Sequence, residues 1–307
     1  MTAPAGGIRV VEVGPRDGLQ NEAADVSTAD KAAFVDLLAA AGLPVVEVAS
    51  FVSPRWVPRM ADAADVFERI TRRPGTRYTA LVPNLAGLER ALAAGANEVA
   101  VFAAASETFS RRNINSGIDE SLARYGEVCR AADAAGIPVR GYLSTSFGCP
   151  YEGPVEAPRV RDLAVRLRQL GVYEVALSDT IGVAHPGQVR LVLDTVLAAV
   201  TPDVLALHFH DTRGTALANV LASLPFGITS FDASAGGLGG CPYAPGAAGN
   251  LATEDLLYML DGLGLDTGVR LPAVIEASAY IAARLDHELP SRVYQAARRS
   301  RASGGAH

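Results

Sequence analysis

Short apolar segments recur eight times along this chain of 307 residues, and each is followed by a stretch long enough to form a helix. The segments are rich in valine, leucine and alanine: Ile8–Val13, Pro44–Ala49, Tyr78–Val82, Glu98–Phe102, Val139–Leu143, Tyr173–Leu177, Val204–His208 and Ile228–Ala233. Short continuous apolar runs predict strands that are buried on both faces. Because these strands alternate with helices, the sequence predicts a parallel α/β sheet, and eight βα units close into a (β/α)8 TIM barrel.

The stretches between the runs carry start and stop signals of helices. Lys31–Ala41 has apolar residues at helical spacing. Ser27 and Thr28 before it are N-cap candidates, and Gly42 after it is a stop signal. An open, doubly wound sheet is the competing fold, but no G-x-G-x-x-G motif opens a helix after the first strand, so we favour the barrel.

No linker-like stretch divides the chain, so we expect residues 1–307 to form a single TIM-barrel catalytic domain. We expect the barrel core to span about residues 8–265. Two further helical patterns, Leu271–Leu285 and Ser291–Arg299, predict a C-terminal helical extension over about residues 270–300. Residues 301–307 are expected to form a frayed tail.

Charge and cysteine content limit the classes of function. The formal net charge is −6 and no basic stripe is present, which argues against a nucleic-acid or membrane partner. No apolar run approaches the roughly 18 residues that span a bilayer, and Met1–Gly7 lacks the basic and apolar parts of a signal peptide. The cysteines Cys129, Cys149 and Cys241 match no zinc motif, so we expect a cytoplasmic protein with reduced thiols.

Lys31 is the only lysine in the chain. It falls in the first predicted helix, on the outer ring of the barrel, whereas barrel active sites lie at the C-terminal ends of the strands. We therefore expect neither a Schiff-base lysine nor a pyridoxal-phosphate cofactor. Activation of a carbonyl or an alkoxide would then depend on a metal ion and arginine.

Polar side chains gather at the C-terminal ends of the predicted strands, inside or directly after apolar runs. These candidate site residues are Arg16, Asp17, Glu47, Tyr142, Asp179, His208, His210, Cys241 and Asn250. Because the C-terminal ends of all eight strands meet at one mouth of a barrel, we expect these side chains to converge there.

His208 and His210 form the strongest pair in this set. Side chains at positions i and i+2 of a strand point to the same face, so both imidazoles can reach one ion; structural histidines are the alternative. Asp17 and Asn250 are expected at the same rim, which gives two oxygen and two nitrogen donors without a thiolate. Such a set favours Mg²⁺ or Mn²⁺, with Zn²⁺ or Co²⁺ as alternatives.

Cys241 lies in a loop dense in glycine, Gly236–Asn250. Glycine lets a backbone approach a ligand closely, and a thiol in such a loop can donate or accept a proton. The alternative is a small buried hydrophobic residue, which is the commonest fate of a free cysteine.

Seven segments of the chain resemble one enzyme family, the 3-hydroxy-3-methylglutaryl-CoA (HMG-CoA) lyases, which are metal-dependent barrel lyases. The segments are Val11–Glu22, Ser50–Pro58, Gly148–Gly153, Ser178–Val183, His208–Thr212, Gly237–Ala244 and Gly249–Asp255. The resemblance extends over about Ile8–Leu289, and the cysteine-containing glycine loop is its most specific part.

The resemblance implies a ligand set and an electrophile. Asp17, His208, His210 and Asn250 would bind the divalent cation. Arg16 would contact the thioester carbonyl of the substrate.

The resemblance also implies roles for the remaining mouth residues. Cys241 would be the loop cysteine needed for turnover. Glu47 would support Arg16 and the metal site, while Gln20, Tyr142 and Asp179 would bind substrate in the pocket.

The implied reaction is a retro-aldol cleavage of HMG-CoA to acetyl-CoA and acetoacetate, as in leucine degradation. Asp17 or His208 would take the proton of the tertiary hydroxyl, and the choice between them stays open. Arg16 would stabilise the enolate oxygen, and Cys241 would help to protonate the enolate carbon.

Two alternatives belong to the same superfamily: a lyase for a longer branched 3-hydroxyglutaryl-CoA, and a metal-dependent aldolase or condensing enzyme. A barrel that only binds CoA esters is the non-enzymatic alternative. The resemblance implies an acyl-CoA partner and a homodimer. Ala23 stands where family members carry a lysine, so another group, such as an arginine, would hold the CoA phosphates here.

Overall fold

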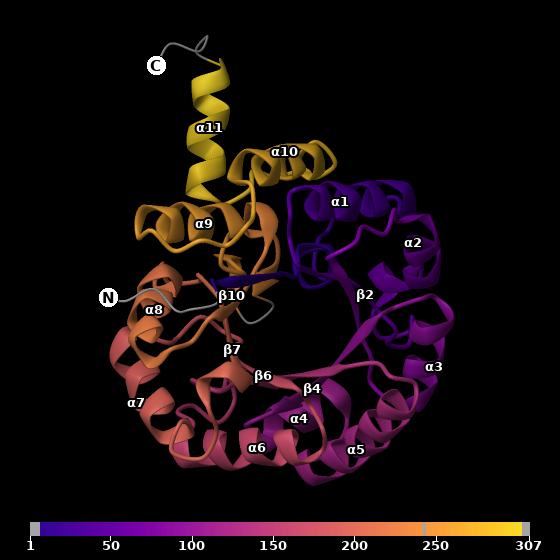
Figure 1. Ribbon diagram of the computed structural model, residues 1–307, viewed down its shortest axis with the longest axis vertical. Helices are drawn as coiled ribbons and strands as arrows, with labels where there is room; N and C mark the ends of the chain where they lie inside the picture. The colour runs from indigo at the N-terminus through magenta and orange to yellow at the C-terminus, as the bar shows by residue number, and fades with distance from the viewer. Residues whose placement is uncertain (1–6, 242–243, 303–307) are drawn as a thin grey trace.

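The eight predicted strands form one closed parallel barrel (Figure 1). The computed structural model describes residues 7–241 and 244–302, without the side chains of 241–248, 301 and 302. The barrel strands are β1 (Arg9–Glu12), β2 (Val45–Ser50), β3 (Arg77–Leu81), β4 (Glu98–Ala104), β5 (Val139–Ser144), β6 (Glu174–Asp179), β7 (Leu205–Phe209) and β8 (Ser230–Ala233). They pair in chain order, β8 closes the ring against β1, and the predicted TIM barrel is confirmed.

A ring of helices surrounds the barrel (Figure 1). Its helices are α1 (Thr28–Ala40), α2 (Ala63–Arg69), α3 (Leu85–Ala93), α4 (Glu107–Ile114), α5 (Ile118–Ala134), α6 (Ala157–Gln169), α7 (Pro186–Val196), α8 (Ala216–Ser223) and α9 (Thr253–Gly262). As predicted, Ser27 caps α1 by accepting the Asp30 amide at 3.1 Å. Gly42 follows α1 with φ +100°, a left-handed conformation that favours glycine. Helix α4 was not predicted as a separate element.

The C-terminal extension consists of α10 (Leu271–Ala282) and α11 (Arg292–Ala302). Helix α10 packs against α1 and α9, and α11 packs against α9 and projects beyond the ring (Figure 1). Helix α10 ends three residues earlier than predicted. Helix α11 continues to Ala302, into the segment predicted as a frayed tail, and residues 303–307 lie outside the description.

The barrel buries an apolar layer outside the strands and a mixed layer inside them. Valine, leucine and phenylalanine side chains fill the space between strands and helices. Inside the barrel, a small apolar cluster that includes Leu81 and Tyr142 lies beside buried charged groups such as Arg140. Since successive side chains of a strand point to opposite faces, Arg140 and Tyr142 of β5 share the interior face.

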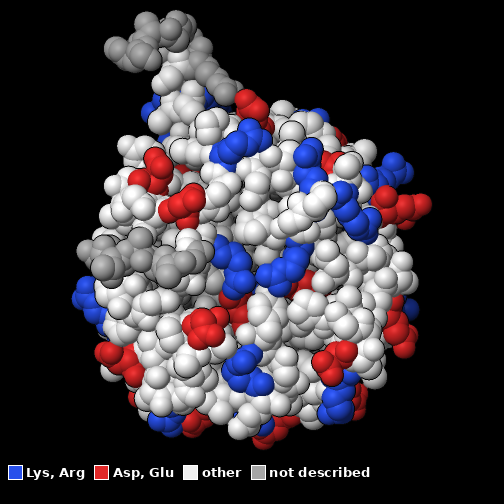
Figure 2. Space-filling view, in the orientation of Figure 1, with Lys and Arg blue, Asp and Glu red and all other residues white. Residues whose placement is uncertain are grey.

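The surface carries charges of both signs. Figure 2 shows basic and acidic side chains interspersed over one face of the molecule, without a continuous basic area. Among the described residues, none of the helices combines the length and apolarity needed to cross a membrane.

Candidate active site

The first candidate residues lie on a single turn of π-helix, η1 (Gly14–Gly18), which follows β1 directly. The amides of Asp17 and Gly18 both donate to the Val13 carbonyl, at 2.8 and 3.2 Å. A side chain at position 18 would meet Leu238 Cβ at 2.8 Å, so glycine is required by the close approach of a second loop. Such π-turns are frequent at functional sites, and this one directs Arg16 and Asp17 to the barrel mouth.

Arg16 is held rigidly by two carboxylates. Its Nε donates to Glu47 Oε2 at 2.6 Å, and its Nη1 pairs with Asp17 Oδ1. Glu47 is fully buried on β2, next to an irregularity in the β2–β3 register that follows it. Burial alone would lower the Arg16 pKa, but the two carboxylates raise it above its usual value. Arg16 is thus a fixed cation at the mouth.

Asp17, His208 and His210 offer ligand atoms that all lie within 4.8 Å of one another. His208 is in β7 and His210 follows it, with ring centroids 5.3 Å apart as the i, i+2 spacing predicts. Asn250 pairs with His210 in a β-bridge, and its Nδ2 donates to Asp17 Oδ2 at 2.9 Å. The structure therefore brings together all four residues of the predicted ligand set.

The chemistry of this group fits a divalent cation. His210 Nδ1 and Asn250 Oδ1 are buried without a hydrogen-bond partner among the described residues. Burial lowers the His210 pKa to about 4, so its imidazole is neutral and free to coordinate. Burial acts to raise the Asp17 pKa, but Arg16 and the two histidines hold it below its usual value, which keeps the carboxylate ionised. Carboxylate, amide and imidazole are ligands of hard and borderline cations.

The predicted substrate-binding residues occupy three different settings. The guanidinium groups of Arg16 and Arg140 both lie over the Tyr142 ring, 5.6 and 5.0 Å from its centroid. The Asp179 carboxylate accepts the amides of Val183 and Ala184, so it holds the β6–α7 loop, and burial raises its pKa to about 6. Gln20 Oε1 is buried and has no hydrogen-bond partner in the part of the chain that the structure describes, which leaves it available to a ligand.

Cys241 ends β9 (Gly240–Cys241), which pairs in an antiparallel manner with β10 (Ala244–Ala248). Its side chain lies outside the described part of the structure. The loop starts at η5 (Ala235–Gly237), where Gly236 and Gly237 have φ near +70°. A side chain at Gly236 would meet Leu289 Cδ1 at 2.4 Å, so the C-terminal extension packs on the base of the cysteine loop.

Two buried glutamates that we did not predict hold the loops of the mouth. Glu12 Oε1 accepts the amides of Gly14 and Ala235, at 2.8 and 2.9 Å, which joins the Arg16 turn to the base of the cysteine loop. Glu254 accepts the Gly236 amide at 2.9 Å. Burial raises the pKa of Glu12 to about 8 and that of Glu254 to about 7. A signal existed for Glu12, since it interrupts an apolar run in the same V-V-E-V pattern as Glu47.

Asp232 of β8 is a third buried carboxylate that the sequence did not single out, and its Oδ2 lies 3.1 Å from His208 Nδ1. Lys31 lies in α1, as predicted. Its ammonium is bound to Asp62 Oδ1 at 2.8 Å and to the Arg59 carbonyl at 2.7 Å. The lysine is thus engaged in the helical ring rather than at the mouth.

The closed barrel, the cation-binding group and the fixed arginine define a metal-site barrel enzyme. The HMGL-like family model matches residues 7–281, and the chain belongs to that family. The mitochondrial hydroxymethylglutaryl-CoA lyase of Bos taurus is 54% identical over 94% of this chain and 89% of its own length.

Solved structures give the same relationship. Hydroxymethylglutaryl-CoA lyase from Pseudomonas aeruginosa has a TM-score of 0.95 and 53% identity, covering 98% of this chain and all of that one. An HMG-CoA lyase from Acinetobacter baumannii in complex with coenzyme A and 3-methylmalate has a TM-score of 0.91 and 40% identity, covering 96% and 97%. The curated relatives include proteins named as mitochondrial and as cytoplasmic.

Proposed function

We propose that the protein is a hydroxymethylglutaryl-CoA lyase, which cleaves HMG-CoA to acetyl-CoA and acetoacetate. The observation that carries this proposal is the fixed Arg16 guanidinium directly beside the Asp17, His208 and His210 group. A carbon–carbon lyase of this kind needs a cation for the hydroxyl and carboxylate of the substrate and a second positive centre for the enolate.

Asp17, His208, His210 and Asn250 would hold the divalent cation, Mg²⁺ or Mn²⁺, with Zn²⁺ or Co²⁺ as alternatives. When bound, the cation supplies Lewis-acid polarisation of the substrate oxygens. Two further oxygen atoms, Gln20 Oε1 and Glu47 Oε1, lie buried at the same mouth without a partner among the described residues, and they suit a polar substrate.

The proton of the tertiary hydroxyl passes to Asp17 or His208, whose Oδ2 and Nε2 lie 4.0 Å apart. The C2–C3 bond then breaks, and its electron pair forms the enolate of acetyl-CoA while the other fragment becomes acetoacetate. Arg16 stabilises the enolate oxygen, a charge that develops during the reaction. Cys241, as the loop cysteine, assists proton delivery to the enolate carbon.

We also propose a domain organisation, a compartment and an assembly for this protein. The chain forms one catalytic domain, acts in the cytoplasm in leucine degradation, and assembles as a homodimer with an acyl-CoA as its ligand. Near Ala23, where family members carry a lysine, Arg59 donates to the Ala23 carbonyl and pairs with Asp25 at 2.9 Å. Its position next to Ala23 supports Arg59 as the arginine that contacts the CoA phosphates.

Product identification tests the proposal directly. The protein is incubated with HMG-CoA and Mg²⁺, and acetyl-CoA and acetoacetate are quantified by mass spectrometry. We expect both products in equal amounts, loss of cleavage after EDTA treatment, and recovery with Mg²⁺ or Mn²⁺. Cleavage that survives rigorous chelation would remove the metal from the mechanism, and preference for a longer branched acyl-CoA would assign the related lyase instead.

A further inference from the structure

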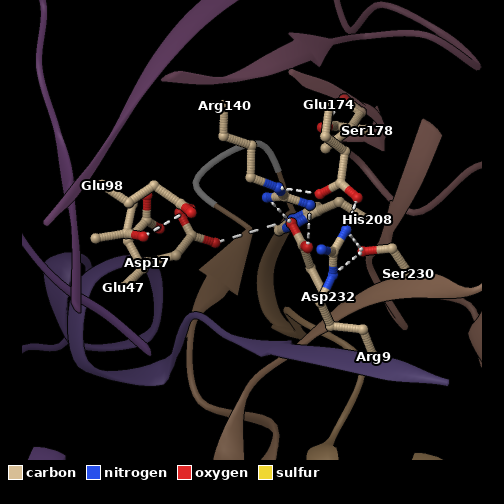
Figure 3. Close-up of polar contacts among 12 residues, drawn as sticks. Arg9, Asp17, Glu47, Glu98, Arg140, Glu174, Ser178, His208, Ser230 and Asp232 are labelled. Carbon is tan, nitrogen blue, oxygen red and sulfur yellow. Dashed lines mark hydrogen bonds and ion pairs between the residues drawn. The ribbon is translucent and has the colours of Figure 1, made fainter. Parts of the chain in front are cut away.

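A line of alternating charges runs through the barrel interior and ends at His208 (Figure 3). Arg9 of β1 pairs with Glu174 Oε1 of β6, and Arg140 Nε of β5 donates to Glu174 Oε2 at 2.7 Å. Arg140 also donates to both oxygens of Asp232, at 2.7 and 3.2 Å. Asp232 Oδ2 then contacts His208 Nδ1 at 3.1 Å. Residues of β1, β5, β6, β7 and β8 thus share one continuous ionic network.

The geometry of this line fixes the last carboxylate in direction as well as in position. The two-pronged contact with Arg140 holds the plane of the Asp232 carboxylate, because both guanidinium nitrogens must meet both oxygens. Arg140, Glu174 and Asp232 are each at most 2% exposed, so water does not compete for these contacts.

A gain in folding stability does not explain why these charged residues are buried inside the barrel. Ionic groups lose their hydration on burial, and a well-packed apolar set of similar volume is commonly as stable. The line nevertheless ends at the candidate cation site, where Asp232 Oδ2 contacts His208 Nδ1. A role in arranging that histidine accounts for this placement.

We propose that Asp232, Arg140 and Glu174 are positioning residues of the cation site, which fix the proton of His208 on Nδ1 and direct Nε2 toward Asp17. An ionised carboxylate accepts hydrogen bonds and donates none, so the ring must carry its proton on the nitrogen that faces Asp232. The other nitrogen, Nε2, then presents its lone pair toward Asp17, 4.0 Å away. This inference rests on the proposed cation site.

The line predicts a graded effect along its length. Asp232 contacts the imidazole itself, Arg140 is hydrogen-bonded to Asp232, and Glu174 is one contact further away, on Arg140. Carboxylates behind a metal-binding histidine orient the ring and raise its basicity, and their loss weakens metal binding about 10–100-fold. The effect of each substitution should therefore decrease with distance from His208.

The test measures Mn²⁺ affinity by isothermal titration calorimetry and by electron paramagnetic resonance, with no substrate present. Asp232→Asn should weaken binding about 10–100-fold, and Glu174→Gln should weaken it less. Glu98→Gln is the matched control, because Glu98 is equally buried in the barrel but pairs with Arg77 and Thr79 rather than with the line. We expect that control to bind Mn²⁺ within twofold of the unchanged protein. A folded Asp232→Asn protein with unchanged affinity, or an equal loss in Glu98→Gln, would overturn the proposal.

A second measurement needs no substitution in the line and so does not depend on how Asp232→Asn folds. In protein labelled with ¹⁵N-histidine, the His208 signals are assigned by their absence from a His208→Gln protein and recorded at pH 9. We expect the proton on Nδ1, whereas a proton on Nε2 would overturn the inference. If the protein binds Mn²⁺ as predicted but releases no acetyl-CoA, the proposed function fails and the positioning roles stand. If it binds no Mn²⁺, both fail.

Discussion

Buried polar groups at one end of the barrel interior are paired, whereas several at the other end have atoms without a partner among the described residues. Toward the N-terminal ends of the strands, Glu98, Arg140 and Glu174 are buried and engaged in ion pairs. At the mouth, buried polar atoms of Glu47 and His210 lack a partner among the described residues. Further unpartnered atoms lie on Gln20, Ser234 and Asn250.

The paired groups support the barrel, whereas the groups with unpartnered atoms are available to bind a ligand. A buried polar atom without a hydrogen bond costs about 1–3 kcal/mol, so several such atoms in one place indicate that another molecule supplies the partners. Away from the mouth, Asn219 Oδ1 of α8 is a single atom of this kind among the described residues. The unpartnered atoms of the mouth are therefore the ones that the proposed cation and substrate would contact. The paired interior behind it keeps that surface in place.

The largest expected effect comes from exchanging the two buried arginines separately. Arg16→Met removes the guanidinium charge at the mouth of the barrel. It should lower kcat about 10³-fold, since removing one group that stabilises an oxyanion lowers kcat about 10²–10³-fold. Arg140→Met leaves two fully buried carboxylates, Glu174 and Asp232, without their shared partner, and breaking a buried ion pair costs about 3–5 kcal/mol of stability. Arg16→Met should cost less stability, because one of its two partners, Asp17, is partly exposed. The checks are steady-state kinetics and thermal unfolding of both proteins.

We expect the two variants to rank in opposite order for activity and for thermal stability. Arg16→Met should be the more impaired in kcat, and Arg140→Met the more impaired in Tm, with circular dichroism as the control for retained secondary structure. A near-normal kcat for Arg16→Met would remove Arg16 from the mechanism.

A smaller effect is expected on the pH dependence of stability, through the two buried glutamates that hold the loops of the mouth. Burial raises the pKa of Glu12 from 4.5 to about 8 and that of Glu254 to about 7. Between pH 4.5 and 8 these two groups therefore hold protons in the folded protein that the unfolded chain releases, so their contribution to stability is greatest at the acid end and falls as pH rises. Each full proton difference costs about 1.4 kcal/mol per pH unit, which corresponds to a few degrees in Tm for each pH unit.

Glu12→Gln isolates the contribution of one group. The amide does not ionise, so Tm should fall less steeply between pH 5 and 8.5 than in the unchanged protein. Glu120→Gln, at an exposed position of α5, is the matched control and should leave the slope unchanged. An identical slope in Glu12→Gln would mean that Glu12 does not titrate in this range.

Local sequence was sufficient to predict the barrel and most of its mouth. Apolar runs located the strands, and the H-x-H spacing placed His208 and His210 on one face because it depends only on strand geometry. The charged line of the interior was not predicted. Arg140 and Asp232 are 92 residues apart, and only closure of the barrel brings them together. The β9–β10 hairpin was missed too, since Ala244–Ala248 reads as a small-residue loop without alternation.

The smallest effect is expected in the helical ring, at Lys31. Its ammonium binds Asp62 and the Arg59 carbonyl, so Lys31→Met removes two charge-assisted contacts and should cost about 1–3 kcal/mol of stability. Because carbonyl activation is assigned to the cation and Arg16, kcat/KM should stay within twofold. Lys31→Arg is the control that keeps the charge. Two results would indicate a lysine imine: a tenfold loss of kcat in Lys31→Met at unchanged Tm, or inactivation of the unchanged protein by borohydride in the presence of substrate. Either result would contradict the assignment of Lys31 to the helical ring and of the chemistry to the mouth.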